Sequence, residues 1–97
     1  MNETEIKKMD YISDVLKAIA HPTRIAMIDL LNTNKKLCVF EIQKSLNIEQ
    51  AVASHHLNIL KNKGVLQCKR EGKKCFYLLK NKKIAGILLC VDQTYFN

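Results

Sequence analysis

The sequence has 97 residues, 47% of them apolar and 26% charged, which fits one small domain over residues 1–97 and excludes a disordered or collagen-like chain. Sixteen Lys and Arg against nine Asp and Glu give a net charge of +7, which favours a polyanionic partner. The N-terminus is acidic, unlike a secretory signal, and the longest apolar run, Ile84 to Val91, is too short to span a membrane. We therefore expect a cytoplasmic protein with no membrane partner.

The first half of the chain predicts three helices. Apolar residues recur at helical spacing over residues 4–20. Pro22 suits the first turn of a second helix, which continues to about residue 31. A polar loop over residues 32–36 then precedes a short third helix over residues 40–46.

A fourth helix, predicted over residues 49–63, has two different faces. Ala53, Leu57 and Leu60 lie close to one line and predict the buried side. The outward face and its flanks hold Gln50, Ala51, Ser54, His55, Asn58, Lys61 and Asn62. Most of this surface is short, polar and uncharged, which favours hydrogen bonding to another surface over simple solubility.

The last third of the chain predicts a hairpin and a final helix. Residues 65–70 and 74–79 read as strands on either side of Glu71-Gly72-Lys73. Residues 61–83 carry most of the surplus positive charge, so the hairpin tip is basic. Apolar residues over 84–95 predict a fifth helix with more apolar surface than one chain covers, which indicates a contact with a second copy.

Together these elements predict a mainly α fold with a small β-hairpin, a winged helix-turn-helix. The fourth helix can enter a major groove of double-stranded DNA while the basic hairpin, the wing, neutralises phosphates. The expected DNA-binding residues are Gln50, Ala51, Ser54, His55, Asn58, Lys61, Arg70, Lys73 and Lys74.

Several short motifs in this order resemble the ArsR/SmtB family of bacterial metal- and redox-sensing repressors. They are Ala20-His21-Pro22-Thr23-Arg24, residues 37–42, Ala53-Ser54-His55-His56-Leu57-x-x-Leu60, Gly64-Val65, Arg70-Glu71-Gly72-Lys73 and Phe76-Tyr77-x-Leu79. The resemblance implies a homodimer joined by the first and last helices. It also implies a transcriptional repressor that binds an imperfect palindrome and releases it when an inducer docks.

The inducer site departs from the family pattern. In members that sense arsenite, cadmium or lead, the third helix carries Cys-Val-Cys; here Cys38 matches the first thiol and Phe40 stands at the second. A soft metal prefers two or three thiolates, so Cys38 needs another cysteine to hold a thiophilic metal or metalloid ion. We expect a cysteine across the dimer to reach Cys38 more readily than the wing cysteines do. Zinc-sensing members use His and carboxylates on the last helix, where this chain offers Asp92 and no histidine.

The two wing cysteines suggest a redox site, depending on the turn. If Glu71-Gly72 is the two-residue turn, Cys68 faces Cys75, and a strained, easily reduced disulfide would suit redox sensing. If Gly72-Lys73 is the turn, Cys75 faces Arg70 and that pairing fails. Cys38, Cys68 and Cys75 are thus the candidate redox residues, whereas Cys90 is expected to be apolar packing.

Two other functions compete with an inducible repressor. An enzyme would need a nucleophile with a base and an orienting group, or a glycine-rich phosphate loop, and the sequence shows neither, so we expect no enzyme. A constitutive DNA-binding regulator of the same fold that has lost its metal sensor is the alternative favoured by Phe40.

Overall fold

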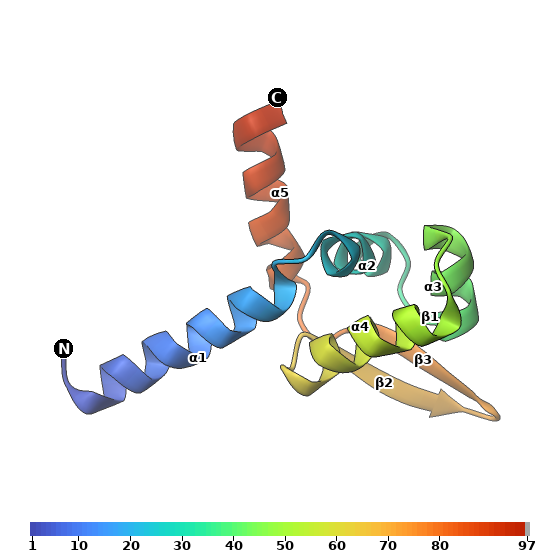
Figure 1. Cartoon of the computed structure of the whole chain (residues 1–97), viewed down its shortest axis with the longest axis horizontal. Helices are drawn as coiled ribbons and strands as arrows, with labels where there is room; N and C mark the ends of the chain where they lie inside the picture. The colour runs from blue at the N-terminus through green and yellow to red at the C-terminus, as the bar shows by residue number, and fades with distance from the viewer. Residues whose placement is uncertain (97) are drawn as a thin grey trace.

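The computed structural model describes residues 1–96, beginning with two helices that meet at a sharp corner (Figure 1). Helix α1 spans Glu3–Ile19, and the Asn2 side chain caps it by accepting a hydrogen bond from the Glu5 backbone N–H at 2.9 Å. Helix α2 spans Pro22–Thr33, with proline in its first turn as predicted. The predicted bounds of both helices are therefore correct to within about one helical turn.

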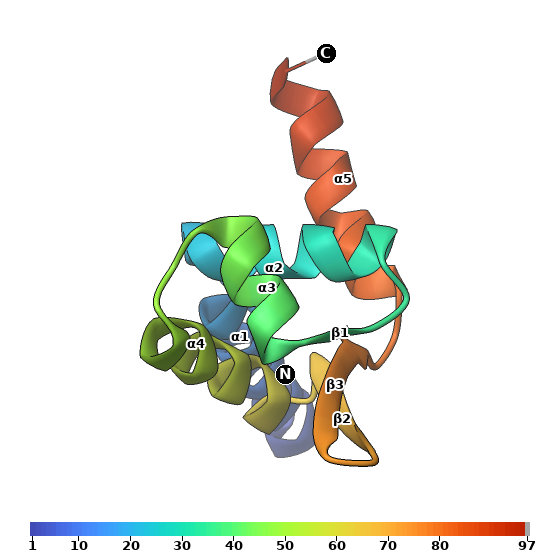
Figure 2. The same cartoon turned by 90° about the vertical axis from the view of Figure 1, so that its right-hand side faces the viewer.

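Helices α3 and α4 form the helix-turn-helix (Figure 2). Helix α3 spans Val39–Leu46 and ends at Asn47, whose left-handed φ of 52° is tolerated by asparagine. Helix α4 spans Gln50–Asn62. Ala53, Leu57 and Leu60 are fully buried, as their spacing predicts.

The wing is a twisted hairpin of β2, Leu66–Glu71, and β3, Lys74–Leu79. A third strand, β1 at Leu37–Cys38, pairs with β3, so the antiparallel sheet has the order β1-β3-β2. The sequence did not predict β1, because two residues are too few to show the alternation typical of a strand. This strand ties the start of α3 to the wing.

One apolar core joins α2, α3, α4 and the base of the sheet. Its largest fully buried side chains are Met27, Ile28, Leu31, Ile42, Leu57, Leu60 and Leu66. From this core α5, Lys83–Phe96, and most of α1 extend outward (Figure 1). The core therefore holds α4 and the wing in place, while the two outer helices keep much of their surface free.

The outer helices carry exposed apolar side chains. They include Ile6, Met9, Ile12 and Leu16 on α1, and Ile87, Leu89, Val91, Tyr95 and Phe96 on α5. Cys90 is also exposed, so its prediction as apolar packing is wrong within the single chain, because α5 projects beyond the core. None of the described helices is long and apolar enough to cross a membrane.

Candidate nucleic-acid interface and thiol sites

The outward face of α4 has the predicted character. Gln50, Ala51, His55 and Asn58 are exposed, and Ser54 is half-buried beside them. The buried side of α4 packs on the core, which leaves the polar side free for a partner. The structure therefore brings the predicted base-contacting residues together on one surface.

The wing lies at the same end of the molecule as α4, and the C-terminus of α5 lies at the other end (Figures 1 and 2). Lys61, at the end of α4, is exposed, as are Arg70, Lys73 and Lys74 of the wing. The predicted phosphate-contacting residues thus flank the polar face of α4.

Lys36 adds a contact that the sequence analysis did not predict. Its ammonium forms an ion pair with the Glu71 carboxylate and lies 4.9 Å from the centre of the Phe76 ring. Glu71 is the single acidic residue between positions 61 and 83, so this pair offsets the negative charge at the wing tip. No local pattern signals it, because β1 brings Lys36 to the wing.

A cluster of His21, Arg24 and His56 connects α1, α2 and α4. His21 caps α2 by accepting a hydrogen bond from the Thr23 backbone N–H at 3.1 Å, and its ring lies 4.5 Å from that of His56. Arg24 donates from Nε to His56 Nδ1 at 3.1 Å and from Nη1 to the Ala18 carbonyl at 3.0 Å. Arg24 thus joins all three helices beside the polar face of α4.

His56 is held in its neutral form within this cluster. Burial lowers its pKa first, and the nearby His21, Arg24 and His55 lower it further. A neutral ring is also what the geometry requires, because Nδ1 accepts the hydrogen bond from the Arg24 cation. We interpret His56 as structural, in contrast to the exposed His55 next to it.

Cys38 is the residue that precedes the first turn of α3. Its backbone N–H donates to Glu41 Oε1 at 3.0 Å, and the Cys38 side chain accepts from the Glu41 backbone. The hydrogen bond from the Cys38 backbone N–H lowers the pKa of the Glu41 carboxyl first, and the Cys38 side chain lowers it further. The Cys38 side chain is only 7% exposed, whereas Phe40, at the position of the missing second thiol, is 60% exposed.

The strand register decides between the two hairpin turns. Cys68 lies opposite Tyr77, and Arg70 lies opposite Cys75, so Gly72-Lys73 is the turn and the directly facing cysteine pair is wrong. Gly72 adopts a φ of 63°, a conformation that favours glycine. This position determines the register and hence which side chains face each other.

The two wing thiols are nevertheless diagonal neighbours on one face of the hairpin, because Cys68 and Cys75 share that face with Arg70 and Tyr77. Burial raises the pKa of the Cys68 thiol, and the neighbouring Cys75 thiol raises it further. Cys38 and Cys75 also line one shallow groove of about 480 Å³ with Val39, Phe40 and Lys74. Because β1 pairs directly with β3, the structure brings Cys75 to the same groove as Cys38, and the expectation that a cysteine across the dimer reaches Cys38 more readily stays a prediction.

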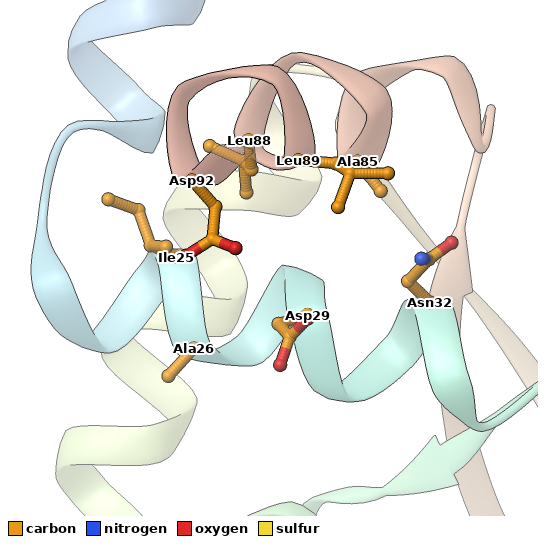
Figure 3. Close-up of a pocket in the computed structure, with 8 residues that line it drawn as sticks. All are labelled: Ile25, Ala26, Asp29, Asn32, Ala85, Leu88, Leu89 and Asp92. Carbon is orange, nitrogen blue, oxygen red and sulfur yellow. The ribbon is translucent and has the colours of Figure 1, made fainter. Parts of the chain in front are cut away.

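Residues 1–96 contain no group of three or more His, Cys, Asp or Glu side chains arranged to hold a metal ion. A cavity of about 410 Å³ lies between α2 and α5, where Asp92 extends from α5 toward α2 (Figure 3). Asp29 is the other acidic residue that lines it, and neither histidine nor cysteine contributes. This cavity therefore lacks the nitrogen and sulfur ligands of a family-like zinc site.

Comparison with known proteins identifies the family. The model of the ArsR family of bacterial regulatory proteins matches residues 21–67, which include α2, the helix-turn-helix and the start of the wing. An uncharacterized HTH-type transcriptional regulator of Methanocaldococcus jannaschii is 34% identical over 91% of this chain and 99% of its own length. The chain belongs to the ArsR family.

Solved structures of this family have the same fold. The crystal structure of the transcriptional repressor PagR of Bacillus anthracis superposes with a TM-score of 0.79 at 30% identity, over 89% of this chain and 98% of PagR. A second match is a homodimeric winged helix-turn-helix DNA-binding domain from Mycobacterium bovis, described as a possible ArsR-family regulator. It superposes with a TM-score of 0.86 at 24% identity, over 97% of this chain and 86% of that one.

Membership of the ArsR family confirms two expectations from the sequence. Over residues 1–96 the fold is a winged helix-turn-helix with five helices and a small hairpin, as predicted. The chain is a transcriptional regulator and not an enzyme, because the family and its matched relatives are regulators.

Proposed function

We propose that this ArsR-family regulator is a cytoplasmic, single-domain transcriptional repressor that binds a palindromic DNA operator as a homodimer and is released by a thiol-reactive inducer. The observation that carries the proposal is the exposed, uncharged polar face of α4 beside a basic wing. This combination suits DNA, because base edges are read by short hydrogen-bonding groups and phosphates by cations.

Two sets of residues divide the work on DNA. Gln50, Ser54, His55 and Asn58 supply donors and acceptors for base edges, and Ala51 can contact a thymine methyl group. The cations Lys61, Arg70, Lys73 and Lys74 contact phosphates. The two sets lie on adjacent elements, since the start of β2 packs on α4.

The dimer forms through α1 and α5. An apolar groove on this side is lined by Leu16 of α1, Ile25 of α2, and Ile87, Val91 and Phe96 of α5. Exposed apolar residues at this density favour association over contact with water. A symmetric pair would present two α4 helices about 34–36 Å apart, one turn of DNA.

The inducer acts on cysteine. Cys38, Cys68 and Cys75 are the candidate targets, and Cys38 precedes the first turn of α3 in the helix-turn-helix. A thiophilic metal or metalloid ion, an oxidant or a reactive sulfur species would each react with thiols. The absence of a three-ligand cluster in residues 1–96 favours, as the second candidate function, a constitutive DNA-binding regulator without a sensor.

Selection of bound sequences from a random duplex pool, followed by gel shift, tests the proposal. We expect an inverted repeat, and release on addition of one of arsenite, cadmium, zinc, hydrogen peroxide or polysulfide. The four single Cys→Ser variants then show which thiol responds. Binding that none of these agents reverses establishes the constitutive regulator, and no sequence enrichment contradicts both functions.

A further inference from the structure

We propose that Cys68 and Cys75, the wing thiol pair, form a two-coordinate site for a soft monovalent cation of the Cu(I) class, which acts as the inducer. This inference rests on the proposed repressor function and identifies the ligand and place of its switch. It is independent of the third-helix position where Phe40 stands.

The strand register places the two thiols at a separation suited to a bridging ion. They are diagonal neighbours across β2 and β3, and such positions have β-carbons about 7–8 Å apart or somewhat less. A disulfide needs about 3.5–4.5 Å, so direct oxidation would require the strands to shift. The thiols still interact, since Cys75 contributes to the raised pKa of Cys68. An ion between the two sulfurs can connect them without a change of register.

The number of ligands selects the kind of ion. No third His, Cys, Asp or Glu completes the wing thiol pair within residues 1–96. Zn²⁺ prefers four ligands in a tetrahedron, whereas Cu(I) is stable with two thiolates in a linear arrangement. Cys75 also lines the open groove beside Lys74, which gives the ion a path from solvent.

Binding of Cu(I) to the wing thiol pair needs no electron transfer. The two S–H bonds break, both protons pass to solvent, and two Cu–S bonds form. The wing thiol pair changes from neutral to a complex with one net negative charge, because two thiolates surround one monovalent cation.

That added charge lies beside two residues that the proposed function assigns to DNA phosphates. Arg70 Nη1 is 3.8 Å from Cys75 Sγ, and the positive charge of Lys61 lowers the pKa of the Cys68 thiol against the larger effect of burial. The bound complex would attract both cations and repel the phosphates, which lowers DNA affinity. Metal binding at the wing thiol pair is therefore coupled directly to the DNA affinity of the adjacent surface.

Metal binding is tested on the full chain without DNA. Under anaerobic conditions, the protein competes for Cu(I) with a chromogenic chelator of known affinity. We expect one ion per chain for the parent and for a Cys38→Ser/Cys90→Ser variant, which keeps only the wing thiol pair. Cys68→Ser and Cys75→Ser should each bind more than about 100-fold more weakly, because a direct ligand is lost.

Two results would overturn the site. Parental affinity in Cys68→Ser would show that the ion binds elsewhere, and loss of binding in Cys38→Ser/Cys90→Ser would place it at those cysteines. Thermal unfolding of each variant checks the fold, and Cys75→Ala provides a second substitution at the exposed end of the pair. Zn²⁺ is the control ion, and tight parental binding of Zn²⁺ would contradict a two-coordinate site.

A second measurement separates this inference from the proposed function. Cu(I) should weaken duplex DNA binding by the parent about three- to tenfold and leave Cys68→Ser unaffected. If Cu(I) binds the wing thiol pair but DNA affinity is unchanged, the switch is wrong while the repressor function stands. If the metal-free parent binds no DNA, the repressor function fails, and with it the regulatory role of the ion.

Discussion

The two ends of this molecule carry opposite surfaces. The end formed by α4 and the wing exposes short polar side chains and cations, among them His55, Asn58 and Lys73. The apolar end, formed by α5 and the C-terminal part of α1 beside it, exposes large apolar side chains, among them Leu16 and Val91. The first surface suits a hydrated polyanion and the second suits another apolar surface, so one small chain offers surfaces for two different partners.

The two ends are also connected differently to the core. Helix α4 inserts three fully buried residues into it, whereas α5 contributes Ala85 as its one buried residue within the described part of the chain. The DNA-facing elements are therefore positioned by the chain itself, while most of α5 needs a second copy to be covered. Arg24 lies between them and contacts α1 and α4 at once.

The largest expected effect comes from adding charge to the apolar end. Val91→Lys places a cation in the groove beside Ile87, so the dimer should dissociate and operator affinity should fall about 100-fold through loss of bivalent binding. Analytical ultracentrifugation and gel shift measure the two effects. Gln93→Lys, two positions along the same helix and hence on another face, is the control. A monomer that retains full operator affinity would contradict the division between the two ends.

Removing the link between the ends should lower stability. Arg24→Leu deletes the hydrogen bonds to His56 Nδ1 and to the Ala18 carbonyl, leaving buried acceptors without a donor. We expect a loss of about 1–3 kcal/mol in the free energy of unfolding, measured in urea. Lys7→Ala, on the exposed side of α1, should change it by less than about 0.5 kcal/mol. Equal stability of the two variants would show that the Arg24 hydrogen bonds do not stabilise the fold.

At the polar end, the face of α4 should control sequence preference. His55→Ala removes one hydrogen-bonding group and should cost about 1–3 kcal/mol on the preferred operator, with relaxed discrimination at particular base pairs. Binding to a panel of single-base operator variants measures this directly. An unchanged base preference would remove His55 from the readout.

The wing should contribute affinity without sequence preference. Lys73→Ala should weaken binding to every duplex alike and reduce the slope of log affinity against log salt concentration by about one. Lys7→Ala makes the same charge change on α1, away from the wing, and should leave the slope unchanged. If the two variants behave alike, net charge and not the position of the wing determines affinity.

The smallest expected effect is a pH dependence from the connecting cluster. The folded pKa of His56 lies below its ordinary value of 6.5, so the unfolded chain takes up a proton first as the pH falls. Stability should therefore decrease as the pH falls through 6.5 toward the lowered folded pKa. His21 and Arg24 of the α2 segment and His55 of α4 face the same ring. Urea unfolding at several pH values should show a smaller decrease for His56→Gln than for the parent, and an equal decrease would contradict the assignment.

Local patterns were enough for most of the fold and for one half of the candidate site. The spacing of Ala53, Leu57 and Leu60 identified the buried side of α4, and by elimination its polar side. Gly64 marked the end of α4 and Gly72 the turn of the hairpin, and both adopt positive φ. These features depend on neighbours along the chain, which is why helical and strand periodicity reveals them.

The sequence by itself determined the five helices of the described chain, the wing and the separation of a polar from an apolar surface, because each follows from side chains a few positions apart. Tertiary structure decided which groups meet. It paired Lys36 with Glu71, set Arg24 against His56, and chose the turn that makes Cys68 and Cys75 diagonal neighbours. Moving the turn by one position shifts every cross-strand partner by two residues and leaves each side chain on the same face of the hairpin. The alternating pattern therefore fits both turns, and only the packed sheet and core select between them.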